Sequence, residues 1–172
     1  MEVRLANEQH IEVHRFHAGV VTGSVILALS LQAFLPLHLR WVQMVDLPLL
    51  VTIYFALSKR NPSAGLLLGM AIGVAQDSLS PTPIGLYGIA KTIVGFVASS
   101  IGARLNVEHP LARCLLTFVF FHLHNAVLVF VSRLLLARPE PYFEASVLIA
   151  SVASALLTIV LFPLLDRLRK PS

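Results

Sequence analysis

Charged side chains are scarce in this sequence. Aspartate, glutamate, lysine and arginine make up 13% of the 172 residues, whereas hydrophobic residues make up 56%, and the mean hydropathy is +0.80. An ordinary soluble domain carries roughly 25% charged residues. Because so little charge cannot cover a surface that faces water, the composition argues against a soluble domain and indicates that lipid is the solvent.

Cysteine and the signatures of catalysis are also missing. Cys114 is the only cysteine, which excludes an internal disulfide and a cysteine metal cluster. No phosphate-binding loop, nucleophile elbow or paired-carboxylate spacing occurs, and no repeat or low-complexity segment interrupts the chain. We therefore expect neither an enzyme nor a bound cofactor or metal, although an intramembrane catalyst built from separated residues stays open.

Long hydrophobic segments are what the sequence has in abundance. Six of them approach the length of about 20 residues that a helix needs to cross a bilayer, and they cover 18–37, 41–58, 61–79, 84–103, 114–132 and 145–165. The sequence thus predicts an all-α integral membrane protein with a six-helix transmembrane bundle. Its expected domains are an N-terminal segment, 1–17, one six-span domain, 18–166, and a basic tail, 167–172.

Lysine and arginine are distributed unevenly between the two ends of such a bundle. One end carries Arg4, Arg15, Lys59, Arg60, Arg104, Arg113, Arg167, Arg169 and Lys170, and the other carries Arg40, Arg133 and Arg138. Basic residues concentrate on the cytoplasmic side of a membrane, so both termini are expected in the cytoplasm. The net charge of +4 is then a topology signal, and no nucleic-acid partner is needed to explain it.

Small residues form rows at helical spacing in the third and fourth segments. Gly65, Gly69 and Gly73 follow a four-residue step that leads to Asp77, and the next segment repeats small and polar residues at three- and four-residue steps. Helices in lipid associate by close backbone packing, which such rows permit. We expect these helices to pack directly on each other through the glycines Gly65, Gly69, Gly73, Gly88, Gly95 and Gly102.

Three charged residues, Asp46, Asp77 and Lys91, fall one each inside the second, third and fourth segments. An unpaired ammonium in the bilayer costs on the order of 2.5 kcal/mol or more, so Lys91 is expected to be held by a carboxylate. Asp77 is the first choice and Asp46 the second, and a ligand or proton site is the alternative. Asp46 could instead cap the helix that starts at Leu47, and Asp77 could be a solvated residue before a turn.

The run FFHLHNAV adds three polar side chains to the fifth segment. His122 and His124 would point about 200° apart on a helix, so they cannot share one metal ion, whereas metal-binding pairs use a four-residue step. His122 and Asn125 share a face. We expect these two to form hydrogen bonds between helices.

Residues 45–96 carry a recognisable pattern, VDLPLLVTIYFALSKRNPSAGLLLGMAIGVAQDSLSPTPIGLYGIAKTIVGF. It combines an Asp-Leu start, an aromatic end with basic residues, a glycine-rich span that ends in Gln-Asp, a Pro-x-Gly-Leu turn and a lysine. This third of the chain resembles the rod-shape-determining protein MreD family of bacterial cell-wall elongation complexes.

The resemblance implies a non-enzymatic scaffold subunit in the bacterial inner membrane that works with the bitopic scaffold MreC. Through MreC it would associate with the glycosyltransferase RodA, a class-B penicillin-binding transpeptidase and the actin-like filament MreB, with membrane lipids around it. The family is also similar to the six-helix substrate-binding subunits of energy-coupling-factor vitamin importers, and a shared fold does not supply a ligand.

A transport subunit is accordingly the alternative function. It would bind a small solute from outside in a pocket lined by Trp41, Asp46, Asp77 and Lys91. Such a subunit needs an open polar cavity with aromatic walls, whereas a scaffold can fill that space and offer an apolar lateral face to a partner helix. Trp41 is the only tryptophan, which disfavours the transport subunit.

Overall fold

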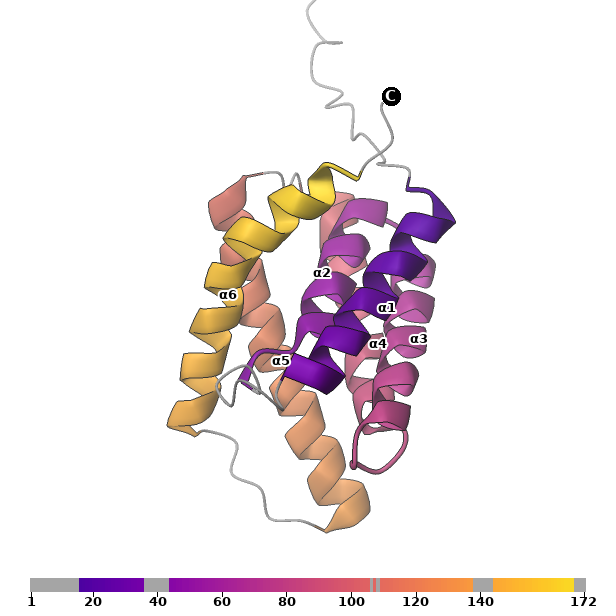
Figure 1. The fold of residues 1–172 in the computed structure, drawn as a ribbon. Coiled ribbons are helices and arrows are strands. Elements are labelled where there is room, and N and C mark those ends of the chain that lie inside the picture. The colour runs from indigo at the N-terminus through magenta and orange to yellow at the C-terminus, as the bar shows by residue number, and fades with distance from the viewer. Residues whose placement is uncertain (1–15, 36–43, 106, 108, 138–143, 169–172) are drawn as a thin grey trace, which may run out of the picture.

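All regular structure in the described part of the chain is helical (Figure 1). The computed structural model describes residues 16–35, 44–105, 107, 109–137 and 144–168, so most of the expected segments 1–17 and 167–172 lie outside it. The helices are α1 (Ala18–Phe34), α2 (Leu47–Lys59), α3 (Pro62–Leu79), α4 (Leu86–Arg104), α5 (Pro110–Leu136) and α6 (Ala145–Asp166). Each lies over one predicted hydrophobic segment, and the predicted all-α class is confirmed.

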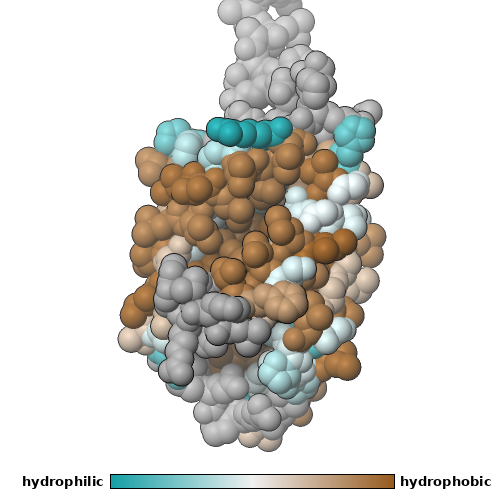
Figure 2. All heavy atoms as spheres, viewed as in Figure 1, coloured by the Kyte–Doolittle hydropathy of each residue, from teal (hydrophilic) through white to brown (hydrophobic). Residues whose placement is uncertain are grey.

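Length and composition mark three of the helices as able to cross a membrane. These are α4, α5 over Pro110–Leu135, and α6, while α1 and α2 are shorter apolar helices. Figure 2 shows one side of the molecule covered by hydrophobic side chains. Large apolar residues are exposed along α6, among them Ile149 and Val160. A surface of this kind is solvated by lipid, so the chain is a membrane protein.

Side-chain caps and prolines define where three helices begin. Asp46 accepts a hydrogen bond from the amide of Leu49 at 2.9 Å, and Asn61 accepts one from Ala64 at 3.2 Å. In α2, α3 and α5 a proline occupies one of the first two positions, where its missing N–H is not needed. For this reason α5 begins at Pro110, four residues before the predicted segment.

Glycine lets α3 and α4 approach each other at backbone distance. A Cβ atom added to Gly69 would overlap the carbonyl of Lys91, and one added to Gly73 would overlap the carbonyl of Tyr87. Gly65 faces Gly95 in the same way. The glycine row of α3 therefore lies against the backbone of α4, and this contact holds Lys91 at a defined depth in the bundle.

The short helix α2 forms the centre of the molecule. Every residue from Pro48 to Ser58 is buried, as expected of a helix that is hydrophobic all round. Tyr54 and Phe55 pack edge-to-face with Phe16, and Tyr54 also packs on Phe162 of α6. Figure 1 shows the last turns of α6 leaning across the end of α2. This central helix carries Asp46 at its start and Tyr54 near its middle.

Candidate functional site

Lys91 is the most deeply buried charge in the described part of the chain. It lies in the second turn of α4, its side chain is fully buried, and its Nζ is 2.5 Å from Oδ2 of Asp46. The other oxygen of Asp46 accepts the amide of Leu49 at the start of α2. Asp46 thus caps α2 and pairs with Lys91 at once, so the two roles that the sequence left open for it coexist.

Asp77 serves a different purpose from the one expected first. Its carboxylate accepts backbone hydrogen bonds at 2.9 Å from Gly85, Tyr87 and Gly88, and only 1% of the residue is exposed. Gly85 has φ +104°, a conformation that glycine adopts without strain and that turns its amide toward the carboxylate. Asp77 therefore caps α4 from the end of α3. The expected Lys91–Asp77 pair is corrected to Lys91–Asp46, because amides already occupy Asp77.

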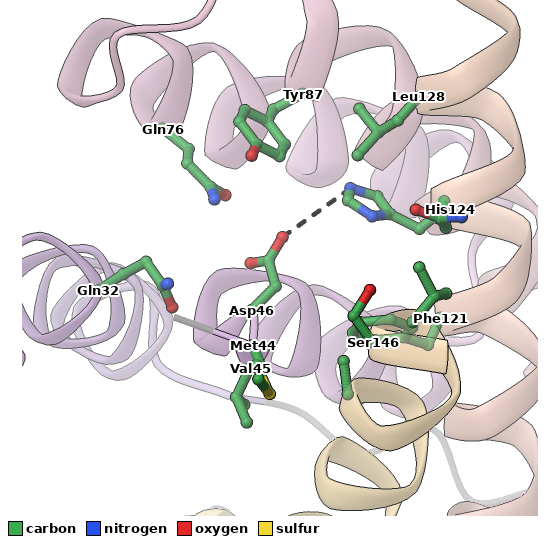
Figure 3. Close-up of a pocket in the computed structure, with 13 residues that line it drawn as sticks. Gln32, Met44, Val45, Asp46, Gln76, Tyr87, Phe121, His124, Leu128 and Ser146 are labelled. Carbon is green, nitrogen blue, oxygen red and sulfur yellow. Dashed lines mark ion pairs between the residues drawn. The ribbon is translucent and has the colours of Figure 1, made fainter. Parts of the chain in front are cut away.

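His124 completes a polar cluster that we define as Asp46, Tyr87, Lys91 and His124. Its Nε2 lies 3.3 Å from Nζ of Lys91 and 3.9 Å from Oδ2 of Asp46, the contact drawn in Figure 3. An ammonium has only donors, so Nε2 accepts and the hydrogen bond requires the tautomer with its proton on Nδ1. The Tyr87 ring stacks on His124 with ring centroids 6.0 Å apart. Nζ of Lys91 lies over the Tyr87 ring, 4.9 Å from the centroid of that ring.

Of the two histidines in the fifth segment, His124 is the one that lies fully in the interior. His124 is 4% exposed, whereas His122 is half-buried and packs edge-on against Phe118 at 4.6 Å. A usable signal was present, because Thr117, His124 and Ser132 repeat at seven- and eight-residue steps, and all three are buried. Small polar residues at helical spacing mark the inward face of a helix in lipid.

A cavity of about 280 Å³ adjoins the polar cluster. Its polar lining comes from all six helices or their caps: Gln32, Asp46, Gln76, Tyr87, His124, Asn125 and Ser146. Of the pocket residues expected from the sequence, Asp46 lines the cavity, Lys91 and Asp77 are not among its lining residues, and Trp41 lies outside the described residues. Asn125 lines this cavity although it was expected to bond between helices.

A second ion pair joins helix ends at the opposite end of α2. Nη1 of Arg113, in α5, is 2.7 Å from Oδ2 of Asp166, the last residue of α6. The hydroxyl of Tyr54 donates to the other oxygen of Asp166 at 2.7 Å, and Nε of Arg113 donates to the carbonyl of Val107 at 2.9 Å. From the sequence, Arg113 served only as a topology marker, and Asp166 received no role.

Metal chemistry has no obvious centre here. No group of three histidine, cysteine, aspartate or glutamate side chains that could hold a metal ion occurs among the residues that the structure describes. The carboxylate of Asp46 is engaged by Lys91 and by the amide of Leu49. What the arrangement can do chemically is hold helices in register and present amide and carboxylate groups to a cavity.

An apolar exterior around internally paired charges defines this chain as a helical membrane protein. Among known families, the model of rod shape-determining protein MreD matches residues 14–170. The chain therefore belongs to the MreD family, and the resemblance seen in residues 45–96 is confirmed over a longer range. No curated protein and no solved structure matches it. Membership supports a role in determining rod shape, in a family of shape-determining membrane proteins that is not a known enzyme family.

Proposed function

We propose that this chain is a non-enzymatic scaffold subunit of the rod-shape complex in the bacterial inner membrane. It acts with an MreC-like bitopic protein to organise a RodA-like glycosyltransferase and a class-B penicillin-binding transpeptidase, and so connects them to the actin-like MreB filament. The observation that carries this proposal is the family match over residues 14–170. The chain acts as one six-span domain with both termini in the cytoplasm.

The distribution of charge supports that topology. Lys59, Arg60, Arg104, Arg113 and Arg167 lie where α2, α4 and α6 end and where α3 and α5 begin, which is one end of an antiparallel bundle. Arg133 lies near the opposite end, in the last turn of α5. This bias agrees with a cytoplasmic location for the end that carries more basic residues. In the proposed topology, Asp46 and the cavity lie in the outer half of the bundle.

The outer surface of α6 supports a role in lateral contacts. Leu148, Ile149, Val152, Leu156 and Val160 are all exposed by 49% to 69% of their surface. The ionised groups of Lys91 and Asp46, in contrast, meet each other inside the bundle. A chain built this way contacts partners through the apolar faces of its helices, while the charges of Lys91 and Asp46 stabilise its own fold.

The test is complementation combined with co-purification. In a rod-shaped bacterium depleted of its own MreD, expression of this chain restores rods, and a tagged copy in mild detergent co-purifies the MreC-like protein and the two synthases. A reporter that is active only outside the cytoplasm stays silent when it is fused to Ser172. Round cells despite normal abundance, or a bright reporter, would contradict the proposal.

The transport subunit is retained as the second candidate because of one observation, the cavity of about 280 Å³ beside Asp46. The same co-purification separates the two functions. A transport subunit brings down an ATPase module in place of wall-synthesis proteins.

A further inference from the structure

The cavity beside the polar cluster has the construction of a binding site, and the scaffold role assigns no ligand to it. Figure 3 shows the side chains of Gln76, Asp46 and His124 pointing toward a common space. They come from α3, the cap of α2 and α5, and Gln32 of α1 and Asn125 of α5 line the same cavity. Helices distant in the sequence therefore converge on this space with polar groups.

Gln76 is the residue that points to a ligand. It is 5% exposed, yet its Oε1 has no hydrogen-bond partner among the residues that the structure describes. A buried amide that lacks a bond is unfavourable, and native proteins satisfy nearly all such groups with protein, water or ligand. Because Gln76 lines the cavity, an occupant of the cavity can supply the missing bond.

The electrostatic balance of the site favours an uncharged occupant. The carboxylate of Asp46 lies in the wall of the cavity, and the ammonium of Lys91 lies 2.5 Å from it. A cation that approached Asp46 would meet the charge of Lys91, and an anion would meet the charge of Asp46. The remaining polar walls include the amides of Gln76 and Asn125, which both donate and accept hydrogen bonds.

We propose that this cavity binds an uncharged polyhydroxylated ligand about the size of one sugar ring. Hydroxyl groups donate to a carboxylate or amide oxygen and accept from an amide N–H, which matches the mixed lining. The volume of about 280 Å³ lies just below the range of about 300 to 1,000 Å³ that is typical of pockets for drug-sized ligands, which fits a ligand of one ring. A free sugar and the sugar headgroup of a membrane glycolipid share this chemistry. The proposal does not depend on the scaffold function.

The binding test uses the full chain in lipid nanodiscs, because alkyl-glycoside detergents carry the same chemistry as the ligand. Glucose and N-acetylglucosamine are titrated at millimolar concentration, and a neutral monohexosyl diacylglycerol is incorporated in parallel discs. We expect a saturable rise in the midpoint of thermal unfolding, as binding to the folded state requires. A response to the free sugars assigns a solute, and a response to the glycolipid alone assigns a membrane source.

Two comparisons make the test specific. Glucosamine and glucuronate, the charged counterparts of glucose, should bind at least tenfold more weakly at equal ionic strength.

Gln76→Leu should weaken binding of the responding sugar at least tenfold. The matched control is Ser78→Leu, on the exposed side of the same helix and outside the cavity lining, which should leave binding unchanged. Asn125→Leu replaces Gln76→Leu if that variant does not fold, with the same expected loss.

The proposal is overturned if none of the neutral probes shifts the midpoint, because the cavity then holds water only. It is equally overturned if the charged sugars bind as tightly as glucose, or if the cavity variant that folds responds like the unmodified chain. Loss of rod-shape complementation with sugar binding intact would contradict the scaffold function alone.

Discussion

Two ion pairs with similar geometry lie at opposite ends of α2, and they differ in how much water reaches them. Lys91 is fully buried and the side chain of Asp46 is 14% exposed, whereas the side chains of Arg113 and Asp166 are 12% and 28% exposed. Removing one partner of a buried pair leaves an uncompensated charge, while water screens an accessible pair. The two ion pairs therefore differ in their contribution to the stability of the fold more than their similar distances suggest.

The surroundings of the two pairs differ as well. The buried pair has His124 and Tyr87 around it and a cavity beside it. The accessible pair joins the beginning of α5 to the end of α6, and Tyr54 of α2 adds a hydrogen bond. The first pair thus shapes the interior where a ligand can enter. The second ties helix ends together at the surface of the bundle.

The largest expected effect comes from breaking the buried pair on one side. Lys91→Met leaves the Asp46 carboxylate without its ammonium, so folding should lose roughly 3 to 5 kcal/mol. The measurement is the folded yield in membranes together with the thermal midpoint of the purified chain. Adding Asp46→Asn should recover much of the loss, because asparagine still caps α2 and no charge remains unpaired.

Asp77→Asn is the matched control for this cycle. Because Asp77 accepts the amides of Gly85, Tyr87 and Gly88, its substitution should add to the defect of Lys91→Met without rescue. If the double variant Lys91→Met with Asp77→Asn recovers and the one with Asp46→Asn does not, the partner assigned to Lys91 is wrong.

A smaller effect is expected from the backbone contact that carries Lys91. Gly69→Ala adds a Cβ against the carbonyl of Lys91, which forces α3 and α4 apart and should cost about 1 to 3 kcal/mol. Gly23→Ala on α1 meets nothing within 4 Å, so stability should be unchanged or slightly higher. Equal thermal midpoints for the two variants would show that the α3–α4 contact accommodates an added methyl group without loss of stability.

The smallest effect is expected at the accessible pair. Arg113→Gln leaves Asp166 with its bond from Tyr54 and with access to water, so the loss should be about 1 kcal/mol or less. The loss should shrink further in high salt, which unfolding at two salt concentrations measures. A loss of stability as large as that of Lys91→Met, and insensitive to salt, would mean that solvent exposure does not determine how much each ion pair contributes to stability.

Local patterns explain why much of the fold was predictable. Hydrophobic length marked all six helices, and the four-residue glycine step of Gly65, Gly69 and Gly73 marked the face of α3 that lies on α4. Asp46 directly before Leu47 and Pro48 is a local cap signal, and the structure contains that cap. The partner of Lys91 and the orientation of His124 were less accessible, because both depend on how separate helices are rotated.

The sequence is sufficient to show that the chain is helical, that lipid surrounds it and that it belongs among MreD proteins, because composition, segment length and motif order are properties of the chain alone. It also determined that Lys91 needs a partner, since a lone ammonium is unfavourable away from water. Which carboxylate becomes that partner depends on how the helices pack. Asp77 is nearer in sequence but is occupied by the amides that begin α4, and the packing of α2 on α4 brings Asp46 to the ammonium. The tertiary structure also places Gln76 at a cavity, because the other walls of that cavity come from helices that are distant in the sequence.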